Sequence, residues 1–338
     1  MFPESGFESR ALIPVNDGLA DLGLTHNVRI VMTKSDTENL HDVPNVMSNA
    51  RFGSTVIYNE NQIFYDVGTR LKGSQRGRAR DVRVGFNLAF DPEDLFLGVH
   101  RTIGIDRSGA GDQFSQKEVL INHAIPRAGN IPGSYVDLIR VVAPLEVHTG
   151  SAILQLARLN DVFLDSQYEN GARGTSFEYE LIYSPNGTVD GNKDSPKVPN
   201  PDSVVGVSMS SQGDDVENYR WHWLIKKNRD EDDYRQLARM LKALGQSEGA
   251  ANFLEQVEEH VDIDQWLRAF AIQILFGIGD SYSSESQHNA QFYVRPSDNK
   301  VLHLPHDMDF IGSQGISSTL ESNNELRKFV KFPQYHRA

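Results

Sequence analysis

The chain contains no cysteine. This absence excludes disulfides, thiol nucleophiles and every zinc or iron–sulfur site that has cysteine ligands. Any metal bound by this sequence must therefore be held by oxygen atoms or by imidazole nitrogens.

Basic residues are in deficit as well. The sequence has 33 Lys and Arg against 46 Asp and Glu, which gives a formal net charge of −13 at pH 7. Nucleic acids are bound mainly through cationic surfaces that neutralise their phosphates. We therefore expect no nucleic-acid partner.

Long hydrophobic runs are also missing, since no window reaches the roughly 18 to 20 uninterrupted apolar residues of a membrane span. The opening residues, MFPESGFESRALIP, lack the basic-then-apolar layout of a signal peptide. We expect no membrane segment in this chain. The helix-like pattern from Asn323 stops without a cap or breaker, so we interpret the sequence as part of a longer protein of unknown localisation.

The length of 338 residues suits one large domain or two lobes. Residues 184–218 are rich in Pro, Gly, Asn and Asp and mark the best boundary. The expected organisation is a loop and strand extension over 1–50, a β-rich N-lobe over 51–200 and a helical C-lobe over 201–338 that is truncated at its C-terminus.

Runs rich in Val, Ile, Phe and Tyr predict one antiparallel sheet in the first part of the chain. These runs are 28–33, 55–58, 63–71 and 82–90. Further on, strand-like sequence covers 153–164 and 176–183, whereas 117–123 and 135–142 are each predicted to be a short helix.

The last third is predicted to be helical. Residues 230–244 place leucines on one face and begin with an acidic run that suits the positive end of a helix dipole. A second helix is expected over 251–261. A third, buried helix begins at Asp262, with Gln265 in the position of a capping box.

Polar residues follow this third helix in a pattern that fits a metal site. Asp280 lies in the next loop, Asn289 precedes a strand, and the strand 301–305 is followed by Asp307 and Asp309. In extended backbone, carboxylates at i and i+2 point the same way, so these oxygens could surround Mg²⁺ or Mn²⁺. The alternative is that the two last carboxylates only cap a turn.

Six basic side chains are concentrated within 14 residues of this acidic chain and could attract a triphosphate. They are Arg70, Lys72, Arg76, Arg78, Arg80 and Arg83. The alternative for this cluster is a solvated strand face. Lys226 and Lys227 could also reach a nucleotide, although surface positions are the preferred interpretation for both.

Several of these segments resemble one family. The run HNAQFYVRPSDNKVLHLPHDMDFIG is similar to the C-terminal signature of spore-coat-protein-H (CotH) kinase-like domains, and DIDQWLRAFAIQILFGIGDSY resembles their buried helix that ends in a functional Asp. Looser similarity covers RLKGS from Arg70 and FLDSQYENGARGTSFEYE, so the resemblance spans roughly residues 60 to 335.

The resemblance implies an α+β, atypical protein-kinase fold with a β-rich N-terminal lobe, a helical C-terminal lobe, and ATP with Mg²⁺ or Mn²⁺ between them. Asp280 would match the catalytic Asp that orients or deprotonates the acceptor hydroxyl. Asp307, supported by Asp309, would match the metal-binding Asp, and Asn289 would assist. The implied activity is phosphate transfer from ATP to Ser or Thr of a protein substrate.

The nucleotide would be bound by Arg70, Lys72, Arg83 and Glu180. Two positions depart from the family pattern. Arg83 stands where a Lys is expected, and arginine is not a neutral replacement for a point-charge lysine. His306 stands where many relatives have Trp.

Two other functions remain open. The chain could be a non-catalytic kinase-like structural or binding module of a larger secreted or cell-surface bacterial protein, which the two departures favour. It could also be a metal-dependent phosphoester hydrolase that uses His303, His306, Asp307 and Asp309. Strand alternation argues against the second, because His303 and His306 point to opposite faces.

Overall fold

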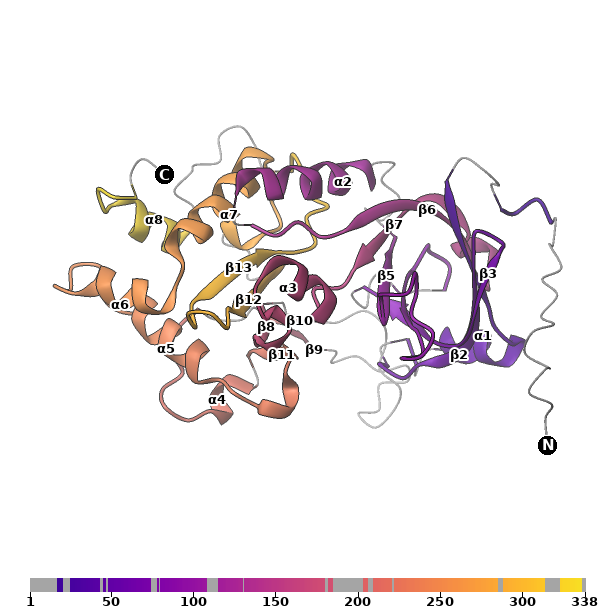
Figure 1. Ribbon diagram of the computed structural model, residues 1–338, viewed down its shortest axis with the longest axis horizontal. Coiled ribbons are helices and arrows are strands. Elements are labelled where there is room, and N and C mark those ends of the chain that lie inside the picture. The colour runs from indigo at the N-terminus through magenta and orange to yellow at the C-terminus, as the bar shows by residue number, and fades with distance from the viewer. Residues whose placement is uncertain are drawn as a thin grey trace. The chain divides into compact units, whose positions relative to one another are not determined.

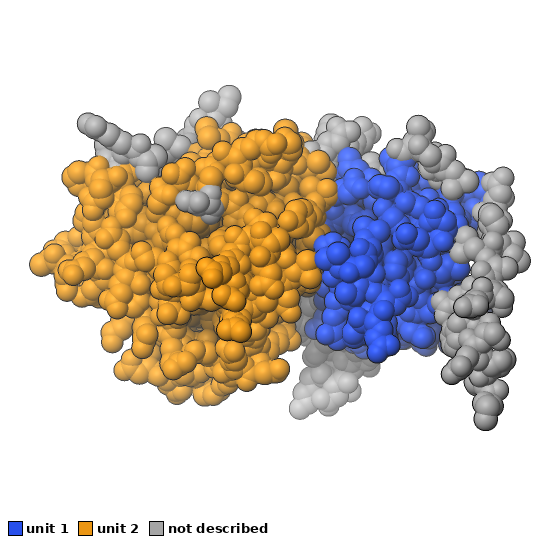
Figure 2. Space-filling view, in the orientation of Figure 1, with its two compact units in different colours: residues 1–111, 137–156 blue, residues 112–136, 157–338 orange. Residues whose placement is uncertain are grey.

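The computed structural model is an α+β structure that divides into two compact units (Figure 2). Unit 1 comprises residues 1–111 and 137–156, and unit 2 comprises 112–136 and 157–338. The structure describes residues 17–20, 25–42, 45–46, 48–73, 78, 80–107, 115–129, 131–179, 182–184, 203–205, 209–220, 222–284, 288–313 and 323–335.

Unit 1 is built on a closed barrel with the strand order β1-β2-β3-β4-β5-β7-β6 in its described residues (Figure 1). The strands are β1 (His26–Val31), β2 (Phe52–Tyr58), β3 (Gln62–Lys72), β4 (Gly85–Ala89), β5 (Thr102–Asp106), β6 (Val136–Val142) and β7 (Gly150–Ala157). The four strands predicted before residue 90 are confirmed. The sheet is not wholly antiparallel, because β1 and β6 pair in parallel, with Val28 opposite Val141, and so close the barrel.

The helix predicted over 135–142 is wrong, since this segment is strand β6. Its sequence, VDLIRVV, has the alternation of a half-buried strand: Ile139 and Val141 are buried, whereas Asp137 is exposed. The prediction for 153–164 is half right, because β7 ends at Ala157 and helix α3 begins at Asp161.

Two histidines lie inside unit 1. His41 follows helix α1 (Lys34–Leu40), and its ring stacks on that of His148 with 4.8 Å between the ring centroids. Both side chains are buried, and neither ring nitrogen of His41 has a hydrogen-bond partner among the described residues. Burial, reinforced by the nearby charge of Arg80, lowers the pKa of each imidazole to about 4.

Unit 2 contains a four-stranded antiparallel sheet in the order β11-β8-β12-β13. These strands are β11 (Leu224–Lys227), β8 (Ser176–Tyr179), β12 (Ala290–Val294) and β13 (Val301–Pro305). The register aligns Ile225, Phe177, Phe292 and His303 in one row across the sheet. This row is buried in an aromatic core, so the face that carries it is the inner face.

Helices surround this sheet in sequence positions close to those predicted. They are α2 (Ser115–Ala124), α3 (Asp161–Gln167), α4 (Glu217–Arg220), α5 (Arg235–Leu244), α6 (Phe253–His260), α7 (Ile263–Leu275) and α8 (Asn324–Val330), and a separate hairpin joins β9 (Ile182–Ser184) to β10 (Ser203–Val205). In the part of the chain that the structure describes, no helix is long and apolar enough to cross a membrane.

Helix α5 begins five residues later than predicted. The acidic run before it forms a short 3₁₀ turn, Arg229–Glu231, and then Asp232 adopts a left-handed conformation with φ 49°. Because a non-glycine residue in this region cannot continue a right-handed helix, α5 starts only at Arg235. The acidic residues therefore do not sit in its first turn.

Helix α7 packs on the edge strand β13 through two successive residues, Gln265 and Trp266. The carboxylate of Asp262 caps α7 by accepting from the Gln265 backbone N–H at 3.2 Å. The Gln265 side chain does not complete the predicted capping box, since its amide donates to the His303 carbonyl at 2.7 Å and accepts from the His303 N–H at 2.8 Å. The Trp266 indole donates to the Val301 carbonyl at 3.0 Å.

Candidate functional site

The candidate site lies at one end of the β12–β13 hairpin in unit 2. Ala290, the first residue of β12, is paired with Pro305, the last residue of β13. The residues before β12 and after β13 therefore emerge at the same end of the sheet. Their backbones are joined there, because the His306 N–H donates to the Asn289 carbonyl at 3.2 Å.

Asp280 is brought to the same place by the loop that follows α7. Its backbone carbonyl accepts from the Asn289 side-chain amide at 2.7 Å, and its carboxylate lies 3.0 Å from Nε2 of His288. About a third of the Asp280 side chain, 32%, is exposed, so the carboxylate can be reached by a ligand. The sequence predicted that Asp280 and Asn289 would meet, but it gave His288 no role.

The loop that carries Asp280 is fixed by its own hydroxyl groups and by α8. The Ser284 hydroxyl donates to the Gly279 carbonyl at 2.7 Å, and the Ser281 hydroxyl donates to the Ile278 carbonyl at 3.1 Å. The buried Tyr282 hydroxyl donates to the Glu325 carboxylate at 2.5 Å. A carboxylate on such a loop is held in place before any ligand binds.

The loop after β13 is anchored through Met308. This side chain is buried in a small apolar cluster with Ile121 and Ile278, while Asp307 and Asp309 on either side of it are half-buried. The extended geometry assumed for the two carboxylates is wrong at the first of them, since Asp307 has φ 52°. The i and i+2 alternation therefore does not apply to this pair.

A divalent ion was predicted at this end of the sheet, and the oxygen atoms present suit one. Oδ1 of Asn289 is buried and has no hydrogen-bond partner among the described residues. Those residues contain no group of three or more His, Cys, Asp or Glu side chains arranged to hold a metal. Mg²⁺ is usually held by one or two carboxylates together with waters and substrate phosphates, so Asp307 and Asn289 could be a sufficient protein contribution.

The phosphoester-hydrolase alternative required His303 as a ligand. This side chain is fully buried on the inner face of the sheet, where its ring packs against Trp266, Phe270 and Phe292. Burial lowers its pKa to about 3. The imidazole is therefore a neutral member of the aromatic core.

The basic residues predicted to bind phosphates lie in unit 1. Lys72, at the end of β3, crosses β4 to form an ion pair with Asp106 on β5. Gly85 leaves room for this crossing, since a Cβ at that position would lie 3.2 Å from the Cβ of Lys72. Arg70 is half-buried on β3, and Arg83 is exposed beside Gly150. Glu180 and Arg76 lie outside the described residues.

The lysines of β11 are paired rather than solvated. Lys226 forms an ion pair with Glu178 on β8 at 2.7 Å, and Lys227 forms one with Asp161 at the start of α3 at 2.9 Å. The sequence favoured surface positions for both lysines, because it does not show that β8 pairs with β11 in the same sheet as the C-terminal strands. Only the register of β8 against β11 shows it.

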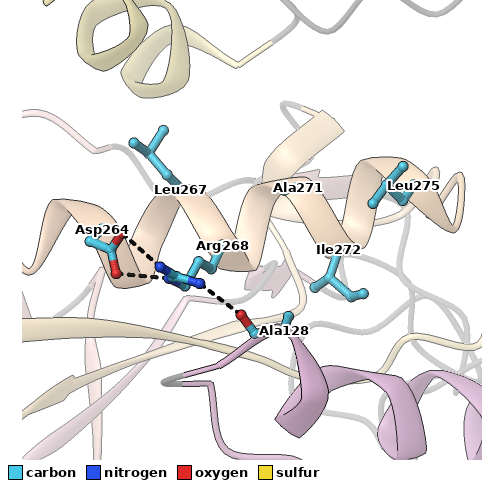
Figure 3. A pocket seen from close by; sticks show the side chains of 7 residues that line it. All are labelled: Ala128, Asp264, Leu267, Arg268, Ala271, Ile272 and Leu275. Carbon is cyan, nitrogen blue, oxygen red and sulfur yellow. Dashed lines mark hydrogen bonds and ion pairs between the residues drawn. The ribbon is translucent and has the colours of Figure 1, made fainter. Parts of the chain in front are cut away.

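A pocket of about 230 Å³ lies along α7, and none of the candidate site residues is among those that line it (Figure 3). It is lined by Ala128, Asp264, Leu267, Arg268, Ala271, Ile272 and Leu275. Its only charged groups already pair with each other, Arg268 to Asp264 at 2.8 Å, and Arg268 also donates to the Ala128 carbonyl. This pocket offers no chemistry to the candidate site.

Comparison with known proteins finds that the C-terminal part of the chain is similar to a family. Residues 180–333 match the family described as CotH kinase protein. The matched segment contains Asp280, Asn289, Asp307 and Asp309, and the resemblance seen in the sequence motifs is thereby confirmed over this range. No curated protein matches the chain.

Proposed function

We propose that the chain is an ATP-dependent protein kinase that transfers a phosphoryl group to Ser or Thr hydroxyls of a protein substrate. The observation that carries this proposal is the convergence of Asp280, Asn289 and the loop of Asp307 at one end of the sheet, within a segment that matches the CotH kinase family. Phosphoryl transfer needs positioning and charge neutralisation more than covalent chemistry, and a few fixed carboxylates can supply both.

In this proposal Asp280 orients or deprotonates the acceptor hydroxyl. Its carboxylate is partly exposed and lies 3.0 Å from Nε2 of His288, while the Asn289 amide holds the Asp280 backbone through its carbonyl oxygen. Asp307, supported by Asp309, and the buried Oδ1 of Asn289 would hold Mg²⁺ or Mn²⁺. The ion would neutralise negative charge on the transferred phosphoryl group.

Arg70, Lys72 and Arg83 remain the proposed phosphate contacts, and Glu180 their proposed partner. The ion pair between Lys72 and Asp106 supports a role for Lys72, because it keeps the ammonium ordered on the outer face of β3. Arg83 is the weaker candidate, since its side chain is exposed.

Radiolabel transfer tests the proposal directly. The chain is incubated with ATP labelled at the γ- or the α-phosphate, with Mg²⁺ or Mn²⁺, and with acidic and basic acceptor proteins. Label from the γ-position on Ser or Thr supports the kinase, whereas label from the α-position would show AMP transfer instead.

A thermal-shift titration separates a kinase from a non-catalytic module. A ligand at about 100 times its dissociation constant adds roughly 2.7 kcal/mol to the free energy of unfolding. Stabilisation by Mg-ATP or Mn-ATP is expected. No stabilisation by either, together with no label transfer, would favour the structural or binding module, for which the exposed position of Arg83 is the supporting observation.

A further inference from the structure

Two neighbouring residues contact different parts of Asp280. Nε2 of His288 lies 3.0 Å from Oδ2 of the Asp280 carboxylate, whereas the Asn289 side-chain amide donates to the Asp280 backbone carbonyl at 2.7 Å. The amide bears on where Asp280 lies in the chain. The imidazole bears on how its carboxylate is turned.

The residues that follow His288 are held in place. The carbonyl of Asn289 accepts from the His306 N–H at 3.2 Å. Strand β12 begins at the next residue, Ala290, which is paired with β13 on one side and with β8 on the other. The His288 side chain is itself largely buried, with 14% of it exposed. The imidazole therefore approaches Asp280 from the end of a strand that is paired on both sides.

The chemistry of the two groups decides which of them donates. An ionised carboxylate can only accept a hydrogen bond, so the hydrogen of this contact is on Nε2 of His288. The contact engages Oδ2 of Asp280, while the Asp280 side chain as a whole is 32% exposed. One carboxylate oxygen thus fixes the plane of the group, and a ligand can still approach the side chain.

From these contacts we infer that His288 is a positioning residue for Asp280, the proposed base. This inference rests on the proposed function and adds a residue that sets the orientation of the base. The Nε2–H group donates to Oδ2 and thereby turns Oδ1 toward the acceptor hydroxyl. A base must lie within hydrogen-bond reach of the proton that it removes, so its orientation affects the rate. A base that a third group orients is a general arrangement in enzymes that activate a hydroxyl.

The proposed step leaves the charge of His288 unchanged. Oδ1 of Asp280 takes the proton of the Ser or Thr hydroxyl, and the hydroxyl oxygen forms a bond to the γ-phosphorus of ATP. The bond between that phosphorus and the bridging oxygen breaks, and ADP leaves with the electron pair. The proton on Asp280 then passes to solvent, while Nε2–H stays bonded to Oδ2. His288 acts through Asp280 alone.

The test is label transfer from γ-labelled ATP to the acceptor protein that the parent chain labels most. His288→Ala removes the donor and should lower kcat by about 10- to 100-fold, a loss that misplacement of a reacting group can cause. His288→Gln should restore most of the rate, because its amide nitrogen donates and is as many bonds from Cα as Nε2 is. His288→Asn should not, since its amide nitrogen is one bond closer to Cα. Mg-ATP affinity, measured by calorimetry, should be unchanged in all of them.

A second measurement separates positioning from a general structural role. In the Asp280→Ala background there is no carboxylate to orient, so adding His288→Ala should cause no further loss of the residual transfer. If His288→Ala does not fold, the comparison of His288→Gln with His288→Asn still decides, because both keep a polar amide.

His260→Ala is the matched control. His260 ends α6 in unit 2, and its ring also contacts a polar side chain, that of Gln236, at 3.2 Å. Removing this imidazole takes away a comparable contact that involves no proposed site residue. The variant should transfer label at the rate of the parent.

The outcomes separate this inference from the proposed function. Equal transfer by His288→Ala and the parent overturns the role of His288 and leaves the kinase in place. The same conclusion follows if His288→Gln is as slow as His288→Asn, or if the loss persists in the Asp280→Ala background. No transfer by the parent chain to any acceptor removes the proposed function and this inference together.

Discussion

Gln265 and His303 are joined by two hydrogen bonds between one side-chain amide and one backbone residue. The amide takes the place that a neighbouring strand would occupy along the outer edge of β13. Edge strands leave backbone groups without partners, and here a helix supplies the missing pair. The strand that leads into Asp307 is thereby fixed to α7, the helix that leads into Asp280.

This relationship predicts that Gln265→Leu destabilises the protein. The substitution leaves a buried N–H and a buried carbonyl of His303 unpaired, at about 1–3 kcal/mol each. We expect a loss of roughly 2–4 kcal/mol in the free energy of unfolding, measured with urea. Gln273→Leu is the control, since it removes a buried amide that has no partner in the described residues and should be neutral or slightly stabilising. Equal losses in both variants would contradict the role given to Gln265.

Substitution of the proposed base should separate chemistry from binding. Asp280→Ala is expected to lower phosphate transfer by a factor on the order of 100 or more, because general base contributions are typically of this size. Its Mg-ATP affinity should stay close to that of the parent. Asp264→Ala, which removes another partly exposed carboxylate beside a cationic partner, is the control and should transfer normally. Equal transfer by Asp280→Ala and the parent would refute the assignment.

Asp307 is predicted to act at the binding step. Asp307→Ala should lose the metal-dependent part of nucleotide binding, so that adding Mg²⁺ or Mn²⁺ no longer tightens the binding of ATP. Calorimetry with and without EDTA measures this difference. Asp309→Ala should show a smaller effect, because Asp309 is proposed only as a supporting ligand. If metal-dependent binding of ATP is unchanged in Asp307→Ala, the metal does not bind at Asp307.

The stacked pair of His41 and His148 predicts a loss of stability in acid. Their folded pKa values of about 4 lie below the ordinary value of 6.5, so folding favours the neutral rings. Each ring contributes on the order of 3 kcal/mol to the free energy of unfolding. This contribution is fully present above pH 6.5 and is lost as the pH falls toward 4. Burial also lowers the pKa of His303, from 6.5 to about 3, so its contribution to stability is lost in acid as well.

Urea unfolding at several pH values between 7 and 4 measures this effect. The double variant His41→Phe/His148→Phe keeps two stacked rings without their titration, and it retains His303. Its stability should therefore fall less steeply with acid than that of the parent. Parallel pH profiles for the two proteins would show that the pair does not titrate as described.

The hydrogen bond from Tyr282 to Glu325 should contribute more to stability than a similar bond near the surface. Tyr282→Phe leaves a buried carboxylate short of a donor, and hydrogen bonds to charged groups are worth about 1.5–3 kcal/mol. Tyr335→Phe is the matched control, since its hydroxyl bonds to Glu258 at 2.6 Å in a more exposed place. A larger loss for Tyr335→Phe would contradict the prediction.

Local patterns in the sequence predicted most strands and helices but not how they join. The alternation from Val84 to Phe90 is enough to place β4, and the apolar residues of α7 are enough to place that helix. The closure of the barrel depends on the parallel pairing of β1 with β6, two segments more than 100 residues apart. Nothing local in either segment specifies that pairing.

The sequence predicted that Asp280, Asn289 and Asp307 would lie near one another, but it did not predict how their side chains are arranged. Asp280, Asn289 and Asp307 stand at the ends of apolar runs, which indicates that they meet where those elements end. The role of Gln265 was misread, because a glutamine three residues after a cap suits a capping box as well as a tertiary contact. His288 was overlooked, since only the fold of the preceding loop brings its ring to Asp280.

The left-handed backbone at Asn289 and Asp307 has a consequence for how relatives of this chain would be compared. With φ values of 58° and 52°, both positions favour Asn, Asp and Gly whatever their chemistry. A descendant that had lost catalysis would still be selected to keep an asparagine and an aspartate there. Their retention across relatives would therefore record the shape of the chain, whereas the fate of Asp280, which carries no such backbone demand, would test its proposed catalytic role.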